Sequence, residues 1–285
     1  MKTYDYIVIG AGSAGCVLAN RLSENPENSV CLVEGGGSDK SLFVKIPAGL
    51  SVLYGHKKFD YAYQGVVQKN LNNRIITVNR GKGLGGSSSI NGMIYIRGNK
   101  NDYDNWSKLG CEGWSYEDVL PVFKKLEMDQ TNGDSKYHSV NGEWPVVKPQ
   151  DANAKVKRFI KSGINIGLPH NVDFNAASQI GLGIYNVNQY KGSRVNSFTA
   201  FIKPILPREN LTILTNTRVD SIEIEDDCAK LVNVQTNGSK KKLICKKETI
   251  LSAGAIESPR ILLSSGIGNK HELKKDVSYT HLRAN

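Results

Sequence analysis

The chain has 285 residues, of which 39% are hydrophobic and 22% are charged, and this composition excludes wholesale disorder. Its net charge of +10 would permit binding to nucleic acid or an anionic membrane. The densest basic stretch, at 240–247, surrounds a short apolar strand. Lysines in such a position are more often solvated than bound to nucleic acid or a membrane. We therefore expect no nucleic-acid partner, and a bound nucleotide anion is a simpler use of local positive potential.

Cysteine content and hydropathy limit the cellular locations that we expect for the protein. The five cysteines are scattered and contain no CxxC pair, so we predict no disulfide framework and no metal ligands. The first strand begins within a few residues of Met1, which leaves no room for a cleavable signal peptide. No stretch approaches the roughly 20 apolar residues that span a bilayer. These features indicate a cytoplasmic protein without a transmembrane segment and leave peripheral membrane contact open.

The first 34 residues predict one strand–helix–strand unit. Apolar runs at 4–10 and 29–34 flank helical spacing at about 13–24, which Asn25 and Pro26 end. Two domains are expected from the length, and they need not be contiguous in sequence.

The junction between the first strand and the helix indicates a dinucleotide site. Gly10 permits a tight turn, Gly12 lets the backbone approach a pyrophosphate, and Gly15 lets the helix pack closely on the strand. The amides at the helix N-terminus, at Ser13 and Ala14, would then face the anion.

An acidic residue completes this pattern. Glu34 ends the second strand, 19 positions beyond Gly15, where a carboxylate would accept hydrogen bonds from ribose hydroxyls and repel a 2′-phosphate. Strand, glycines, helix and terminal acid in this order favour an adenine dinucleotide over an ordinary glycine-rich turn. The pattern leaves open whether the dinucleotide is NAD or FAD.

A second glycine-rich segment follows a predicted strand at 74–79. Glycines and then serines at 81–89, at a helix start, offer amides and hydroxyls that suit a diphosphate or an electron-rich ring edge. A flexible loop is the alternative, but it does not explain the ordered apolar run Ile90–Ile96.

Helices are predicted in the middle of the chain. Ser115, with Asp118 three positions later, begins a helix that runs to about Glu127, and Asp151 caps another. A short helical stretch lies near 194–203.

Strands dominate after residue 210. They are predicted at 211–215, 218–225, 231–236, 242–245 and 248–252. The Asn237–Gly238 pair predicts a hairpin that sets 231–236 antiparallel to 242–245. Ala253 and Gly254 follow the last strand, where small residues permit close approach of a cofactor or close packing, and Ser258–Pro259 begins a helix. The order predicts an α/β fold: a Rossmann-like core with a parallel sheet, antiparallel strands and inserted helices.

Three segments resemble the glucose-methanol-choline (GMC) oxidoreductases, FAD-dependent alcohol dehydrogenases and oxidases. The glycine, serine and asparagine pattern at 81–104 and the segment 254–268 match two family signatures, and 113–125 is also similar. The resemblance covers residues 4–270.

The resemblance implies an FAD site and gives roles by position. Gly10, Gly12, Gly15 and Glu34 would hold the ADP half of FAD, and the backbone of Val219 would meet the adenine. The resemblance also implies that the flavin and its phosphates lie against Gly83, Asn91, Gly92, Met93 and Ile94. The cofactor-binding set is completed by Ser13, Ala14, Gly86, Ser87, Ala253 and Gly254.

The resemblance also bears on attachment and catalysis. Some relatives attach the flavin through a histidine just before the double-glycine segment; Arg80 stands there in this chain, so noncovalent FAD is expected. In the family, a histidine near the end of the full-length chain accepts the hydroxyl proton. None of the five histidines here matches it, so we assign no catalytic residue in this chain.

By this comparison residues 1–275 form a discontinuous FAD-binding domain, with part of a substrate domain inserted at about 131–200 and the C-terminal catalytic half absent. Residues 276–285 show no family pattern, and we interpret them as a foreign tail.

The leading hypothesis is oxidation of a small alcohol, choline or another primary alcohol, to an aldehyde, with an unspecified electron acceptor. The alternatives are a lyase of the hydroxynitrile type and a non-catalytic nucleotide-binding module. An NAD-dependent dehydrogenase is weaker because residues 81–98 would have no role in it.

Overall fold

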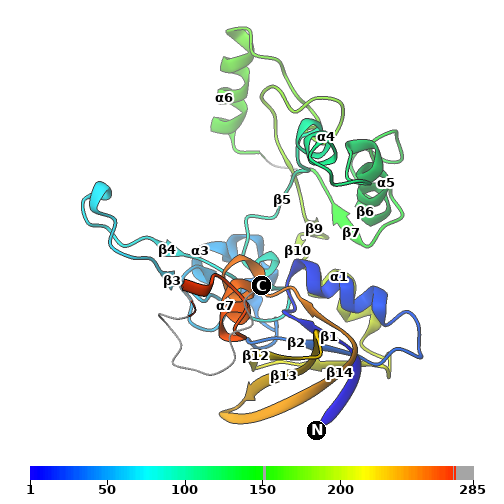
Figure 1. Ribbon diagram of the computed structural model, residues 1–285. Coiled ribbons are helices and arrows are strands. Elements are labelled where there is room, and N and C mark those ends of the chain that lie inside the picture. The colour runs from blue at the N-terminus through cyan, green and yellow to red at the C-terminus, as the bar shows by residue number, and fades with distance from the viewer. Residues whose placement is uncertain (150–151, 272, 274–285) are drawn as a thin grey trace. The chain divides into compact units, whose positions relative to one another are not determined.

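The computed structural model describes residues 1–149, 152–271 and 273 (Figure 1), so Asp151 and the tail at 276–285 lie outside the described residues. The chain divides into two compact units. One contains residues 1–44, 48–90 and the chain from 196 onward, and the other contains residues 45–47 and 91–195. The second unit therefore starts well before the insertion expected at about 131–200, and each unit is described by itself.

A six-stranded sheet organises the first unit, in the order β11–β2–β1–β14–β13–β12 (Figure 1). Its strands are β1 (Lys2–Ile9), β2 (Val30–Val33), β11 (Leu211–Leu214), β12 (Thr217–Glu225), β13 (Cys228–Thr236) and β14 (Ser239–Leu251). Neighbours from β11 to β14 pair in parallel, whereas β14, β13 and β12 pair antiparallel. The predicted α/β class, a parallel core extended by antiparallel strands, is confirmed.

The prediction of two strands at 242–245 and 248–252 was wrong, because the chain forms the single strand β14. Its first half pairs with β13 across the Asn237–Gly238 turn, as predicted, and its second half pairs with β1. The register against β1 shifts where Cys245 opposes Tyr4 and Glu248 opposes Tyr6. This bulge accommodates the two lysines between them, so the polar pair interrupts the apolar pattern without ending the strand.

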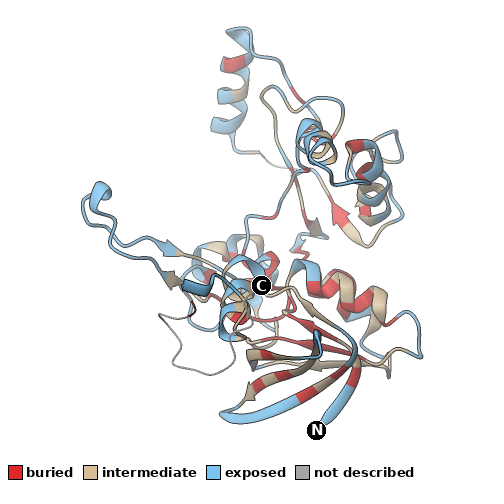
Figure 2. Cartoon of the chain, viewed as in Figure 1, coloured by how far each residue is buried: buried red, intermediate tan, exposed pale blue. Residues whose placement is uncertain are grey.

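The core of the first unit lies on the central strands. All four residues of β2 are buried, as are the last three of β1, which is the near-continuous apolar pattern of parallel strands covered on both faces. Figure 2 shows this burial in the middle of the sheet, whereas the hairpin of β3 (Tyr63–Gln64) and β4 (Thr77–Val78) is largely exposed. The strand predicted at 74–79 is thus reduced to two residues.

Two helices frame the glycine-rich junctions of this unit. Helix α1 (Ser13–Leu22) follows β1, and α7 (Gly254–Ser264) follows β14. The α7 helix begins four residues before the start predicted at Ser258–Pro259, so Pro259 lies inside the helix. Small residues after β14 let the helix begin directly after the strand. Pro259 has no backbone N–H, so the helix lacks one intrahelical hydrogen bond there.

Short helical pieces complete the first unit. They are α2 (Leu42–Lys45), which ends at the unit boundary, α3 (Leu50–Leu53), 3₁₀ turns at Pro47–Gly49, Lys69–Leu71, Gly86–Ser89 and Lys203–Ile205, and a π-helical turn at Phe198–Ile202. A single 3₁₀ turn therefore stands where the serines after the double glycine predicted a helix start.

The described residues of the second unit form three helices and pairs of short strands. The helices are α4 (Lys100–Lys108), α5 (Tyr116–Leu126) and α6 (Ala154–Asn165), and the paired strands are β5 (Ile94–Tyr95) with β8 (Asn186–Val187), β6 (Glu127–Asp129) with β7 (Trp144–Val146), and β9 (Gln189–Tyr190) with β10 (Ser193–Arg194). The predicted capping box of Ser115 and Asp118 begins α5, and Asn153 caps α6. Within the described residues, no helix is long and apolar enough to cross a membrane.

Gly15 should be required for stability. A Cβ added there would lie 1.8 Å from the carbonyl oxygen of Gly10 and 2.8 Å from Ser252 Oγ, and the backbone cannot yield easily. We expect Gly15→Ala to lower the free energy of unfolding by about 2 kcal/mol or more, measured by urea denaturation. Gly12→Ala is the matched control, because no heavy atom lies within 4 Å of a Cβ there. Equal losses in the two variants would contradict this account of Gly15.

Candidate functional site

A pocket of about 480 Å³ lies in the first unit, at the carboxyl ends of its parallel strands. The last residues of β1, β2 and β14, which are Ile9, Val33 and Leu251, all line it, and the start of β12 closes one side. Ligands of open α/β sheets bind at this edge, where strand-to-helix turns present free amides.

Most of the residues predicted to bind the cofactor line this pocket. They are Gly10, Gly12, Ser13, Ala14, Glu34, Gly86, Ser87, Val219, Ala253 and Gly254. Gly15 and Gly83 lie beside the pocket and are absent from its described lining. Asn91, Gly92, Met93 and Ile94 belong to the second unit, so the structure does not bring them into this set. Their flavin contact remains a prediction.

The glycine turn and the second glycine-rich segment are packed backbone to backbone. The Gly85 amide donates to the Ala11 carbonyl at 2.8 Å, and a Cβ on Gly86 would lie 2.7 Å from the Gly12 Cα. Gly86 has a φ of +52°, in the left-handed region that favours glycine. The two motifs therefore form one wall, although Ala11 and Gly85 are 74 positions apart in sequence.

Glu34 holds that wall together. Its Oε2 accepts a hydrogen bond from the Ala11 amide at 3.0 Å, and its Oε1 accepts from Gly36 at 2.8 Å and from Gly83 at 3.0 Å. The side chain is buried, and burial raises the pKa of the carboxyl although the three amides oppose this shift. A carboxylate oxygen can accept two bonds, so Oε2 retains capacity for a ribose hydroxyl. The predicted ribose contact would thus add to a structural role that the sequence did not reveal.

Several lining residues were missed by the sequence analysis. The rings of Tyr61 and Tyr63 stack with centroids 5.3 Å apart, and both line the pocket. Glu257 and Arg260 line it from α7, where they form an ion pair of 2.7 Å. Their i, i+3 spacing predicts that ion pair for any helix that begins at Gly254. The tyrosines carried no such signal, because they lie in and just before the two-residue strand β3, which no sequence pattern predicted.

The charged side chains at the pocket favour an anion. Arg80, Arg218 and Arg260 line it, against Glu34 and Glu257, and Glu34 is already turned toward backbone amides. A diphosphate would gain from this excess of cationic groups together with the amides of the α1 N-terminus.

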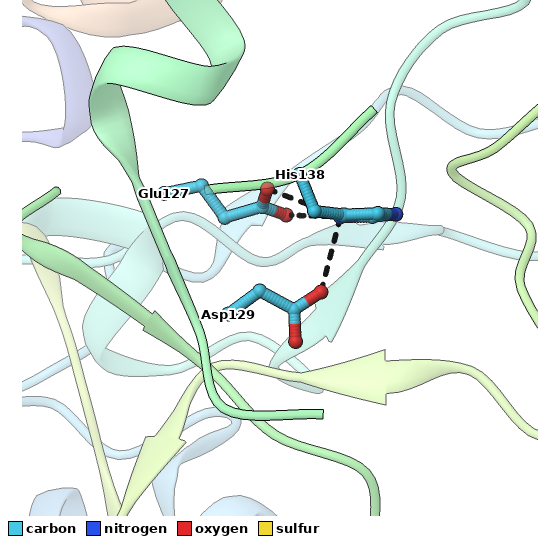
Figure 3. A group of neighbouring side chains, drawn as sticks. All are labelled: Glu127, Asp129 and His138. Atoms are coloured by element: carbon cyan, nitrogen blue, oxygen red, sulfur yellow. Dashed lines mark hydrogen bonds and ion pairs between the residues drawn. The ribbon is translucent and has the colours of Figure 1, made fainter. Parts of the chain in front are cut away.

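A buried charged network lies in the second unit (Figure 3). His138 Nδ1 lies 3.1 Å from Glu127 Oε2 and 3.0 Å from Asp129 Oδ2, and His138 Nε2 lies 2.8 Å from Asp173 Oδ2. Arg97 Nη2 donates to Glu127 Oε2 at 2.9 Å. Both the histidine and the two carboxylates of Figure 3 are buried. No sequence pattern gave His138 a role.

Glu127, Asp129 and His138 have the chemistry of a cation site, since their donor atoms lie within 4.8 Å of one another. However, both ring nitrogens of His138 face carboxylates at hydrogen-bond distance, which is the arrangement of a doubly protonated imidazolium. Burial by itself lowers the His138 pKa, but hydrogen bonds with Asp129, Asp173 and Glu127 outweigh it and raise the pKa to about 11. The cluster therefore fits an internal ion network better than a metal site.

The sheet order, the glycine turn and the pocket at the carboxyl ends define a Rossmann-like dinucleotide-binding fold. A sequence model of the family described as GMC oxidoreductase matches residues 4–281. The chain belongs to the GMC oxidoreductase family.

Individual relatives agree with this assignment. The chain is 43% identical over 274 residues to "Alcohol dehydrogenase [acceptor]" of Pseudomonas putida, covering 95% of this chain and 50% of that protein. It is 38% identical over 270 residues to "Oxygen-dependent choline dehydrogenase" of Rhizobium johnstonii, covering 95% and 49%. The chain thus spans about half the length of the curated relatives it matches.

Solved structures share the fold. Pyridoxine 4-oxidase from Mesorbium loti superposes with a TM-score of 0.90 at 33% identity, covering 95% of this chain and 53% of that one. Formate oxidase from Aspergillus oryzae, in a study of FAD modification, superposes with a TM-score of 0.87 at 28% identity, covering 96% and 49%.

The charged network predicts a pH-dependent contribution to stability. His138→Gln leaves buried carboxylates without their cation and should cost about 3–5 kcal/mol near neutral pH. Because folding raises the His138 pKa from 6.5 to about 11, the stabilisation is complete below pH 6.5 and is lost as pH rises through about 11. The difference between wild type and variant, measured by urea denaturation, should shrink over that range.

The control is His170→Gln, at an exposed histidine, which should change stability by less than about 0.5 kcal/mol. A wild-type-to-His138→Gln difference that stays constant from pH 6 to 11 would show that His138 is not held as the imidazolium.

Proposed function

We propose that this chain is the FAD-binding portion of an oxidoreductase that acts on the CH–OH group of a small alcohol. The observation that carries the proposal is the single pocket wall built from the 10–15 turn, the 81–87 segment and the Ala253–Gly254 junction. These segments are far apart in sequence, and each offers backbone amides or small residues to an extended phosphate-bearing ligand.

FAD is favoured over NAD by the second glycine-rich segment. Gly81, Gly86 and Ser87 line the same pocket as the glycine turn, and a nicotinamide dehydrogenase gives that segment no role. The solved formate oxidase structure is described in terms of FAD modification, which also favours FAD over NAD.

Within the pocket the chain would bind and orient the cofactor. The diphosphate would lie at the α1 N-terminus near Gly12, Ser13 and Ala14, the ribose near Glu34 and the adenine against Val219. When bound, FAD supplies a hydride acceptor at flavin N5, so that an alcohol losing a hydride from carbon and a proton from oxygen becomes an aldehyde. From the resemblance to the family, we propose no catalytic residue in this chain and expect the proton acceptor in the half that the relatives contain in addition.

The substrate class follows from the relatives' names. Proteins named alcohol dehydrogenase and choline dehydrogenase favour a primary alcohol, with choline as one candidate and the electron acceptor unassigned. We further propose that part of a substrate domain is inserted at about 131–200, most of which lies in the second unit. All five cysteines are free thiols, which supports a cytoplasmic location.

FAD binding itself is the first test. After FAD is added and free FAD is removed by gel filtration, the protein fraction should retain a yellow flavin spectrum, and anaerobic addition of an alcohol to the full-length protein should bleach it. Absence of flavin binding would refute the proposed function, whereas binding without bleaching by any alcohol would favour a lyase or a non-catalytic module.

Gly12→Ala should separate binding from folding. Gly12 lines the pocket and no heavy atom lies within 4 Å of an added Cβ, so the methyl group would occupy space expected for the pyrophosphate. We expect the Kd for FAD to rise about tenfold or more, measured by quenching of flavin fluorescence. The melting temperature of the unliganded variant is the control and should stay close to that of the wild type. An unchanged Kd would place the pyrophosphate elsewhere.

The bound flavin should be noncovalent. Residues 81–98 contain no histidine, and Arg80 precedes them. Acid precipitation of the FAD complex should therefore release all flavin into the supernatant. Flavin that remains with the precipitated protein would contradict this prediction.

A further inference from the structure

A β-bulge in β12 lies in the wall of the pocket. Val219 pairs with Val234 and Ser221 pairs with Asn233, so Asp220 is an extra residue on β12. A bulge of this kind disrupts the ladder locally and frees backbone groups for other partners. Val219 is buried and lines the pocket, so the carbonyl at this bulge needs a partner from outside the sheet.

Arg260 supplies that partner. Its Nη2 donates to the Val219 carbonyl oxygen at 2.7 Å, and its Nε donates to Glu257 Oε2 at 2.7 Å. Glu257 Oε1 in turn accepts a hydrogen bond from the Tyr63 hydroxyl at 2.7 Å. One continuous chain of hydrogen bonds therefore joins the β12 bulge, the first turns of α7 and the β3 strand. All four residues line the pocket.

The charges determine which group donates and which accepts in each of these hydrogen bonds. Burial raises the pKa of the Glu257 carboxyl, but hydrogen bonds with Tyr63 and Arg260 outweigh it and hold the pKa below its ordinary value. Burial and the Glu257 charge both raise the pKa of Tyr63, so its hydroxyl stays protonated and donates. The planar guanidinium of Arg260 donates to Glu257 and Val219 at once. Each bond is charge-assisted, and the side chains of Arg260 and Glu257 are only 27% and 19% exposed.

We propose that Arg260 is a positioning residue for the adenine end of the cofactor, with Glu257 and Tyr63 as its support. The inference rests on the proposed function, which sets the adenine against the backbone of Val219. Because Arg260 holds the Val219 carbonyl, it fixes the orientation of the peptide group between Val219 and Asp220, where the bulge removes ladder bonds. Without Arg260, that peptide group can rotate and the wall loses its shape for a planar base.

The chain offers a matched control at Arg208. Its Nη1 donates to the Asn20 carbonyl oxygen at 2.7 Å and to Ser23 Oγ at 2.9 Å, so it makes the same kind of bond at the same distance within the same unit. Arg208 does not belong to the described lining of the pocket. Any general cost of removing an arginine that ties down a carbonyl should therefore appear in both Arg208→Met and Arg260→Met.

The experiment measures binding of ADP and of UDP to the 285-residue chain by isothermal titration calorimetry. These ligands share the diphosphate and ribose and differ in the base. We expect Arg260→Met to weaken ADP binding about tenfold and to reduce the preference for ADP over UDP, whereas Arg208→Met should change ADP affinity less than about twofold. Melting temperatures of both unliganded variants should fall by similar amounts.

A second variant keeps the test decisive if Arg260→Met fails to fold. Tyr63→Phe removes only the far end of the hydrogen-bond chain and should weaken ADP binding by about twofold to fivefold in the same direction. Wild-type affinity and base preference in Arg260→Met, or in Tyr63→Phe if only that variant folds, would overturn the positioning role. If the wild-type chain binds neither ADP nor FAD, the proposed function itself fails, which is a different outcome.

Discussion

The architecture of the pocket depends on one carboxylate. Glu34 accepts hydrogen bonds from the amides of Ala11, Gly36 and Gly83, which belong to the glycine turn, the loop after β2 and the second glycine-rich segment. Each of these amides would otherwise need water or a ligand, because none lies within a regular element. Desolvation makes such a charge costly unless it is fully hydrogen-bonded, so the amides and the carboxylate require one another. Internal bonds thus hold the wall of the pocket in shape.

A second set of bonds acts on another wall of the same pocket. There Arg260 pairs with Glu257 and donates to the backbone at the β12 bulge, so that each of the two walls is held by a side chain that binds backbone groups. Glycine, serine and alanine residues of the glycine turn, the second glycine-rich segment and the Ala253–Gly254 junction also line the pocket, where they permit close approach of a ligand and add little bulk. Fixed walls with small residues at the strand-to-helix turns suit a ligand that carries a phosphate.

Local sequence patterns predicted the parts of the structure that local forces determine. The turn at Asn237–Gly238 and the capping box at Ser115 appear as predicted, because each is settled by a few neighbouring residues. The continuity of β14 was missed, because pairing with β1 decides it and no nearby residue reports that pairing. His138 was missed for the same reason, since its partners lie up to 35 residues away and only the fold brings them together.

Strand β14 has a consequence for how the chain acquires its structure. It pairs residues 243–251 with residues 2–9. One edge of the central strand β1 therefore has no partner until more than 230 further residues have been synthesised. At roughly 5–20 residues per second of synthesis, β1 spends about 10 seconds or more with one edge unpaired. An open apolar edge is a template for pairing with other chains. Early in synthesis, this chain is therefore expected to depend on chaperones or on rapid completion of β14 to stay free of aggregation.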